Sequence, residues 1–207
     1  IPSDISSSSF FIVLTVLSKN SKLLIKNVNV NNSRIGVVHI LKRMGGDIVF
    51  KNKKIYKGEK IADIQIKGGR TIKAINCPSK LNSDAIDEFL LIFLVAAKAK
   101  GISYFKDLAE LNQKESPRLK WGSKILNMMG IKNIVTDSTL KIYGNPNLEI
   151  NKQIVIKNFL KDHRVFMMSC IAAVTFGGKW RIHNKDSINS SFPKFLKILK
   201  NLGADIK

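Results

Sequence analysis

Four short segments of the sequence bring charged and hydroxyl side chains together where helices are expected to begin. They are Asp4 with Ser6, Ser7, Ser8 and Ser9; Asp84 with Asp87 and Glu88; Lys114 with Glu115 and Arg118; and Asp162 with His163 and Arg164. A helix N-terminus has unpaired N–H groups and about half a positive charge, so it binds anions. Basic side chains are unfavourable there unless an anion offsets them. These clusters therefore predict binding of an anionic ligand.

Basic residues are placed in this way at several expected helix starts. They are Lys114, Arg118, His163 and Arg164, with Arg34 at the start of a further helix. Taken one at a time, the clusters also fit ordinary helix caps, charges that complement a helix dipole, or a solvent-exposed helix face. Their joint occurrence favours a single anion-binding face, provided that the helix starts share one end of the domain.

An internal repeat would bring the helix starts together. Around Gly45, Gly130 and Gly203 the sequence three times shows the end of an amphipathic helix, a glycine stop and a short strand. We predict three units, at about residues 1–70, 71–150 and 151–207. Expected helices span 6–18, 34–44, 84–100, 114–129, 162–176 and 192–202, and expected strands span 23–28, 47–50, 62–66, 103–106, 133–136, 140–143 and 180–183. This alternation predicts the α/β (α+β) class, with closing strands missing from the last unit.

Length, hydropathy and cysteine content restrict the class of protein further. The 207 residues are 44% hydrophobic, which allows a real core. The longest apolar runs, 10–17 and 89–97, are too short to span a membrane, and no targeting signal is recognisable. Cys77 and Cys170 lack metal-type spacing, so we expect reduced thiols in a cytoplasmic protein, with Cys170 in the core. His39 and His183 have no ligand-spaced partner, so we expect structural roles for both.

The strong positive charge has two explanations. The chain carries 35 basic and 15 acidic residues, a net charge of +20. Such a balance is typical of nucleic-acid-binding proteins, which keeps a basic binding module open as an alternative. However, only six of the basic residues are arginine, the lysines are scattered, and no basic stripe or stacking aromatics are evident. We therefore predict attraction of small anions and no nucleic-acid partner.

Six short motifs occur along the chain in an order and spacing that can be compared with those of a known family. They are Ile1-Pro-Ser-Asp4, Asn31-Asn-Ser-Arg34-Ile-Gly36, Ile86-Asp-Glu88, Lys114-Glu-Ser-Pro-Arg118, Asp162-His-Arg164 with Met167, and Ser191-Phe-Pro193. In this order and spacing, the chain resembles the C-terminal half of the 5-enolpyruvylshikimate-3-phosphate synthase family. Each motif alone is weak, but six in register are specific. The related fold that transfers enolpyruvyl to a UDP-N-acetylglucosamine acceptor is the enzyme alternative.

The resemblance implies a fold, a reaction and partners. The family has two similar domains, each of three βαβαββ units, with the active site between them; this chain would be the C-terminal domain, residues 1–207. The enzyme transfers the enolpyruvyl group of phosphoenolpyruvate to the 5-hydroxyl of shikimate 3-phosphate and releases phosphate, without a metal or organic cofactor. The missing N-terminal half would be the partner of a fragment that is inactive alone. The complete enzyme is expected to be a cytoplasmic monomer without membrane contact.

The resemblance also implies roles for individual residues. Asp87 matches the carboxylate that accepts a proton, and Glu115 matches the one that protonates the methylene carbon of phosphoenolpyruvate. Lys114 would contact the shikimate substrate, while Arg118 and Arg164 would hold phosphoenolpyruvate. His163 would orient groups beside them, and Arg34 would add positive charge near the cleft. No metal site is implied.

The chain departs from the family pattern near its lysine motif. Asn112 and Gln113 replace the usual Arg and Val, and Pro117 replaces an Asp before Arg118. Proline is tolerated in the first turn of a helix because no N–H is needed there. Loss of the Asp is expected to loosen the support of Arg118.

Overall fold

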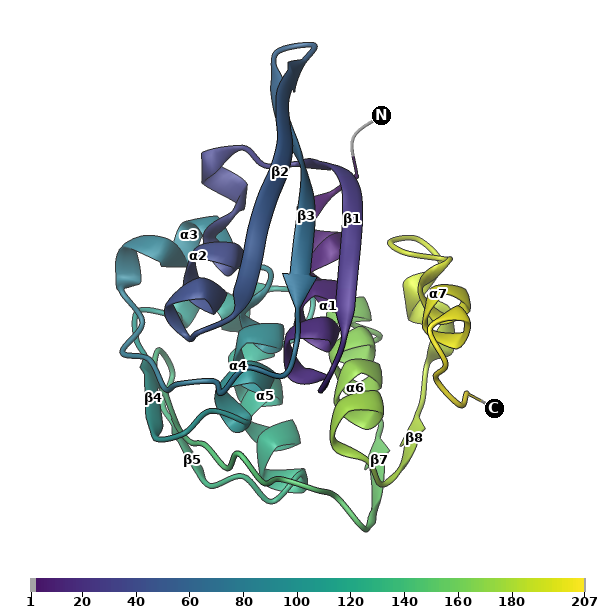
Figure 1. The fold of residues 1–207 in the computed structure, drawn as a ribbon. Coiled ribbons are helices and arrows are strands. Elements are labelled where there is room, and N and C mark those ends of the chain that lie inside the picture. Colours follow the sequence, from purple (N-terminus) through teal and green to yellow (C-terminus); the bar gives the residue numbers. More distant parts are fainter. Residues whose placement is uncertain (1–2, 207) are drawn as a thin grey trace.

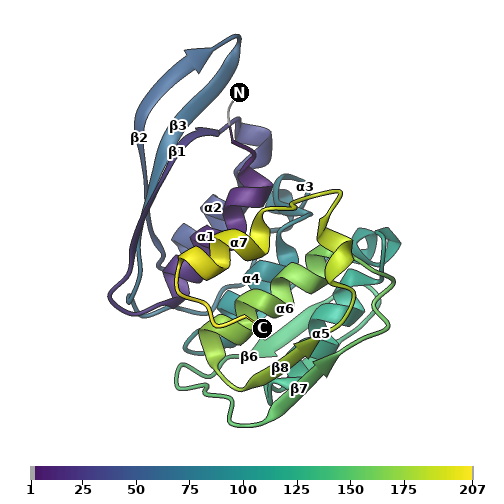
Figure 2. The same ribbon diagram turned by 90° about the vertical axis from the view of Figure 1, so that its right-hand side faces the viewer.

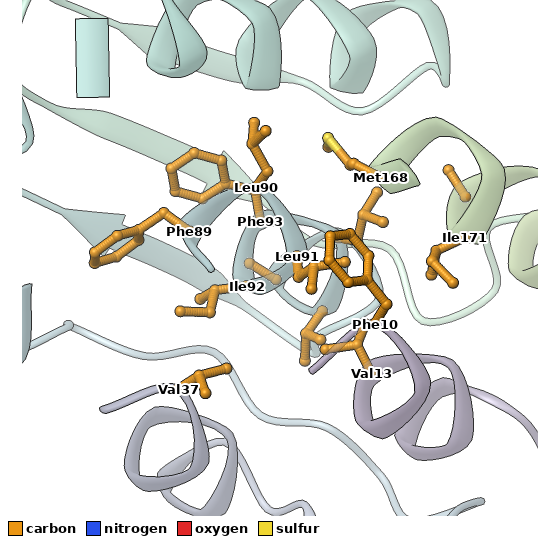
Figure 3. Packing of buried hydrophobic residues seen from close by; sticks show 14 of the residues in the cluster. Phe10, Val13, Val37, Phe89, Leu90, Leu91, Ile92, Phe93, Met168 and Ile171 are labelled. Carbon is orange, nitrogen blue, oxygen red and sulfur yellow. The ribbon is translucent and has the colours of Figure 1, made fainter. Parts of the chain in front are cut away.

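Three apolar helices form the centre of the molecule. The computed structural model describes residues 3–206, so Ile1 and Pro2 of the first motif lie outside the described residues. The central helices are α1 (Ile5–Leu17), α4 (Phe89–Ala97) and α6 (His163–Phe176), and each contacts the other two (Figure 1). Every residue of α4 is buried, as expected of a helix that is hydrophobic on all sides. Phe10 from α1, Phe93 from α4 and Met168 from α6 belong to this core (Figure 3).

Small sheets surround the central helices. The first contains β1 (Lys22–Asn29), β2 (Asp47–Tyr56) and β3 (Glu59–Lys67) in the order β1-β3-β2; the second contains β4 (Ile102–Phe105), β5 (Asn133–Val135) and β6 (Leu140–Tyr143) in the order β4-β6-β5. Both are antiparallel with the last strand in the middle. In the third, β7 (Gln153–Ile156) and β8 (Lys179–Ile182) pair in parallel. Figure 2 shows the first sheet on one side and β6 to β8 on another.

The three units share one topology, which confirms the predicted repeat. The parallel pairing of β7 with β8 has counterparts in isolated parallel bridges, Ser3 with Val28 and Asn76 with Tyr104. In each unit a central helix connects these two paired segments. The third unit contributes two strands to its sheet within the described residues.

An outer helix completes each unit. These are α2 (Gly36–Arg43), α5 (Arg118–Met128) and α7 (Phe195–Asn201). All three end alike: the N–H groups of Gly46, Ile131 and Ala204 donate to the carbonyls of Leu41, Leu126 and Leu199. The preceding glycines have φ of +97°, +87° and +98°, as the left-handed helix stop requires. The glycine stops predicted from sequence are therefore confirmed.

Short elements connect the units. They are α3 (Asn82–Ala85) and the 3₁₀ turns η1 (Asn32–Arg34), η2 (Ser79–Leu81), η3 (Ala109–Gln113) and η4 (Lys185–Ile188). The outer helices pack on the central ones: α5 contacts α4 and α6, and α2 contacts α4. Phe195 of α7 packs edge-on against Phe10 of α1, with ring centroids 5.6 Å apart.

Several predicted boundaries were wrong. The helix expected at 84–100 is interrupted at Ile86–Glu88, and the one expected at 114–129 begins only at Arg118. Pro117 explains the second difference, because the residue before a proline avoids helical dihedrals. The helix expected at 34–44 begins at Gly36, after a 3₁₀ turn that contains Arg34.

Two strand features were also missed. The strand β7 was not predicted at all, although its residues alternate in burial. The β2–β3 hairpin continues beyond the expected strands to a turn at Lys57 and Gly58, both with positive φ, and projects past the helices (Figure 1). Its outer half is exposed and rich in lysine, so hydrophobic alternation could not reveal it.

The cysteines and two of the histidines lie away from the hollow described below. Cys77 and Cys170 are free and buried, and burial raises the pKa of their thiols to about 11 and about 12. His39 and His183 are exposed and do not line the hollow described below. Within residues 3–206, no helix has the length and hydropathy needed to cross a bilayer.

Candidate active site

Charged side chains from the second and third units line one hollow of about 430 Å³. Its lining residues are Asp87, Gln113, Lys114, Glu115, Arg118, His163 and Arg164. They come from the turn before α4, the end of η3 and the loop that follows it, and the first turns of α5 and α6. The hollow brings together residues as far apart in the sequence as Asp87 and Arg164. Except for Arg34, each predicted site residue lies in it.

Arg118 is the centre of the charge network. Its side chain is only 2% exposed, and Nε donates to Asp162 at 2.9 Å. Its Nη1 donates to Asp87 at 3.2 Å, while Nη2 pairs with Glu115. The guanidinium thus joins one buried carboxylate to the two carboxylates that face the hollow. A guanidinium suits this arrangement because it is planar and holds its five N–H donors in fixed directions.

Asp162 holds Arg118 in place through a buried ion pair. This carboxylate caps α6 by accepting from the Arg164 N–H at 2.9 Å, and it also accepts from Ser116 Oγ at 2.8 Å. Burial alone would raise the pKa of Asp162, but the hydrogen bond and charge of Arg118 and the hydrogen bond from Ser116 outweigh it and lower the pKa. The missing Asp at position 117 therefore does not leave Arg118 without support.

Removal of this buried charge should weaken the whole domain. We expect Asp162→Asn to lower the free energy of unfolding by about 3 kcal/mol, because Arg118 loses a buried ionic partner. Urea unfolding of the 207-residue chain measures the change. The control is Asp137→Asn, since Asp137 is 93% exposed and only reaches Lys120 at 3.4 Å. Equal effects of the two substitutions would contradict a special role for Asp162.

Arg164 lies along another wall of the hollow. Its Nη1 donates to the backbone carbonyl of Asp87 at 2.9 Å, and its Nη2 lies 3.9 Å from Asp87 Oδ2. The side chain is 14% exposed. Among the described residues, no acceptor lies within hydrogen-bond distance of its Nε or Nη2. Arg164 lines the hollow, so Nε and Nη2 retain hydrogen-bonding capacity for a ligand there, with Nη2 also facing Asp87.

Lys114, Glu115 and His163 complete the rim. Lys114 Nζ lies 3.0 Å from Glu110 and 3.9 Å from Asp87. Glu115 is 52% exposed, and its Oε1 lies 3.9 Å from His163 Nδ1. Burial and the charge of Arg164 lower the pKa of His163, against the opposing effect of Glu115 and Asp162. A lowered pKa favours the neutral imidazole, which can orient neighbours without adding charge.

Arg34 occupies a different place. It lines a second hollow with Ser3, Asp4, Ile5, Asn29, Asn31 and Glu59, and its Nη2 lies 3.6 Å from Asp4. Asp4 caps α1, as one interpretation of its cluster predicted, by accepting from the Ser7 N–H at 2.8 Å. Arg34 does not share the hollow of Arg118 and Arg164.

The site includes a group of potential metal ligands. Oxygen or nitrogen atoms of Glu115, Asp162 and His163 lie within 4.8 Å of one another. However, Arg118 contacts both carboxylates, and its positive charge opposes a cation at that point. We therefore assign no metal to these residues.

Sequence reasoning missed the supporting residues. Asp162 and Ser116 were noticed only as members of a cluster and of motifs, and their support of Arg118 was not predicted, because the bond from Ser116 to Asp162 joins residues in different units. Gln113 was noted only as a departure from a motif. Glu88 was grouped with Asp87, yet the structure buries it behind Arg164, with only 3% exposed.

Comparison with solved structures defines the class. The enolpyruvyl transferase NikO from Streptomyces tendae is similar over 100% of this chain and 44% of its own, with a TM-score of 0.75 and 17% identity, which shows the fold alone. The architecture is thus the enolpyruvyl transferase fold. EPSP synthase from Acinetobacter baumannii is similar over 100% of this chain and 47% of its own, with a TM-score of 0.93 and 35% identity.

The family is established by sequence comparison. The EPSP synthase (3-phosphoshikimate 1-carboxyvinyltransferase) family matches residues 1–199, and the chain belongs to this family. A 3-phosphoshikimate 1-carboxyvinyltransferase of Thermoanaerobacter sp. (strain X514) is 38% identical over 95% of this chain and 45% of its own length. That of Ruthia magnifica subsp. Calyptogena magnifica is 36% identical over 100% of this chain and 46% of its own. The chain therefore spans about half the length of these relatives.

Proposed function

We propose that the complete protein transfers the enolpyruvyl group of phosphoenolpyruvate to the 5-hydroxyl of shikimate 3-phosphate, and that residues 1–207 supply one wall of its active site. Family membership supports the reaction. One observation supports the assignment of this reaction to particular residues: Asp87 and Glu115 both line the hollow and both contact Arg118. The hollow thus joins anion-binding groups to two carboxylates, which an addition with two proton transfers needs.

The site has groups for each part of the addition step. Asp87 takes the proton from the attacking 5-hydroxyl, whose oxygen bonds to C2 of phosphoenolpyruvate. Glu115 gives a proton to the methylene carbon, so the double-bond electrons form the new C–H bond. Elimination then returns that proton to Glu115 and breaks the bond from C2 to the phosphate oxygen. Phosphate leaves with the electrons of that bond and takes up the proton that Asp87 received, so both carboxyl groups return to their starting states.

The basic residues bind the anions. The free edge of Arg164 suits a phosphate or carboxylate of phosphoenolpyruvate, which an arginine can hold by two parallel hydrogen bonds. Arg118 is occupied by carboxylates in this structure. An anion that replaces Glu115 on Arg118 leaves that carboxyl free to carry a proton. Lys114, which lies between Glu110 and Asp87, is placed for the shikimate substrate.

Location and assembly belong to the same proposal. Two buried, unpaired cysteines are typical of a reducing compartment, which supports the cytoplasm. The partner is the N-terminal half of the enzyme, which would provide the opposite wall, and we expect the complete protein to be a monomer. A nucleic-acid-binding role is not favoured, because the family match covers nearly the whole chain.

The assay is phosphate release from the two substrates by the complete protein, and Arg164→Lys gives a specific test. We expect KM for phosphoenolpyruvate to rise about tenfold, with a smaller change in kcat, because a point charge replaces a fork. Arg70→Lys serves as the control, since Arg70 is 65% exposed and pairs with Asp47 outside the hollow. An unchanged KM in Arg164→Lys would remove Arg164 from phosphoenolpyruvate binding.

A further inference from the structure

Glu88 is a buried acidic residue that the proposed mechanism does not use. It ends the turn before α4, its carbonyl accepts from the N–H groups of Leu91 and Ile92, and its side chain is 4% exposed. It does not line the hollow. Its Oε1 is buried without a hydrogen-bond partner and lies 3.7 Å from Arg164 Nη1. A buried carboxylate with an unpaired oxygen is costly, so its presence needs an explanation.

Two units contribute the surroundings of Glu88. Burial is the largest effect on Glu88 and raises its pKa, and the charge of Asp87 acts in the same direction. Ser6, Arg164 and Arg34 lower the pKa but do not cancel the effect of burial. Ser6 is buried in the first turn of α1. Its neighbours Ser8 and Ser9 donate their hydroxyls to α1 backbone carbonyls instead. Glu88 therefore lies between the start of α1 and the arginine at the start of α6.

Glu88 lies beside one nitrogen of the Arg164 guanidinium. Nη1 is held by the Asp87 carbonyl at 2.9 Å and faces Glu88 at 3.7 Å. With Nη1 turned inward, Nε and Nη2 remain for a ligand in the hollow. An arginine side chain has many rotamers, and holding it in one rotamer before binding reduces the entropy that is lost when the ligand binds.

We propose that Glu88 is a positioning residue: its buried carboxylate holds the guanidinium of Arg164 with its free edge toward the anion of the substrate. The proposal rests on the function proposed above. It predicts that removal of the negative charge weakens anion binding, which is opposite to the electrostatic expectation. A negative charge beside an anion site lowers affinity by Coulomb repulsion, so its removal alone would tighten anion binding. A positioning role predicts weaker binding instead.

The test compares Glu88→Gln with Glu149→Gln in the complete protein. The first removes the charge with little change of shape; the second makes the same change at an exposed residue outside the hollow. We expect Glu88→Gln to raise KM for phosphoenolpyruvate at least about tenfold, with kcat changed less than about threefold, because the loss lies in binding geometry. Glu149→Gln should match the unmodified protein. An unchanged or lower KM in Glu88→Gln would overturn the proposal.

A second measurement does not depend on turnover. In NMR spectra of the 207-residue chain, rotation of the Arg164 guanidinium about its Nε–Cζ bond should be slow, and Glu88→Gln should make it faster. Arg164→Lys assigns the signal, and Ser6→Ala should have a smaller effect in the same direction. If the complete protein lacked transferase activity, the proposed function would fail, yet this measurement would still decide the role of Glu88. Equal rotation rates with and without the Glu88 carboxylate would overturn that role.

Discussion

Glu115→Gln in the complete protein is expected to lower kcat at least about a hundredfold, because glutamine keeps the shape and hydrogen bonding of the side chain but cannot deliver a proton. The position of Glu115 supports this expectation. It is half exposed at the hollow, and it shares Arg118 with the buried Asp162. The measurement is phosphate release at saturating concentrations of both substrates.

The affinity of Glu115→Gln for phosphoenolpyruvate shows whether the substitution removes only proton transfer or also disrupts substrate binding. Glu115 pairs with Arg118, which the proposed function assigns to anion binding, so Glu115→Gln should leave the affinity for phosphoenolpyruvate unchanged or increase it. Glu149→Gln is again the matched control, and it should keep normal turnover. If Glu115→Gln retained turnover within about threefold of normal, Glu115 would have no part in proton transfer.

The residues of the site were largely predictable from the sequence. Lys114, Arg118, His163 and Arg164 were selected because basic side chains at expected helix starts are unfavourable without an anion, whereas Asp87 and Glu115 received their roles from the resemblance to the family. The repeat then predicted that these starts lie together. That prediction depends only on local helix signals and on one topology used three times, both of which leave a mark in the sequence.

The failures have one local cause and otherwise arise from contacts between distant residues. Lys114 and Glu115 do not lie on a helix, because Pro117 delays the start of α5. Arg34 was assigned near the others, but η1 directs it toward Asp4. The burial of Glu88 depends on Ser6 from the first unit and Arg164 from the third. No local pattern around residue 88 reports neighbours that are so distant in the chain.

The 207-residue chain alone is expected to bind phosphoenolpyruvate weakly and to release no measurable phosphate, and addition of the N-terminal half should restore activity. The chain spans 45% to 47% of the length of its relatives, and in the proposed function its anion-binding groups supply only one wall of the site. Glu115 is 52% exposed and Asp87 is 35% exposed, so water reaches both carboxylates. Water screens these charges and competes with the substrates for the arginines, which weakens both positioning and electrostatic stabilisation of the transition state.

The complementation assay mixes the two halves and follows phosphate release from phosphoenolpyruvate and shikimate 3-phosphate. The control replaces the 207-residue chain by its Glu115→Gln variant, which should dock equally well but give at least about a hundredfold less activity. Activity that appears only with both halves, and only with Glu115 present, would locate proton transfer in this chain and the rest of the site in its partner. Robust release by the 207-residue chain alone would contradict the two-walled site, because its own hollow would then have to bind both substrates and exclude water without a second domain.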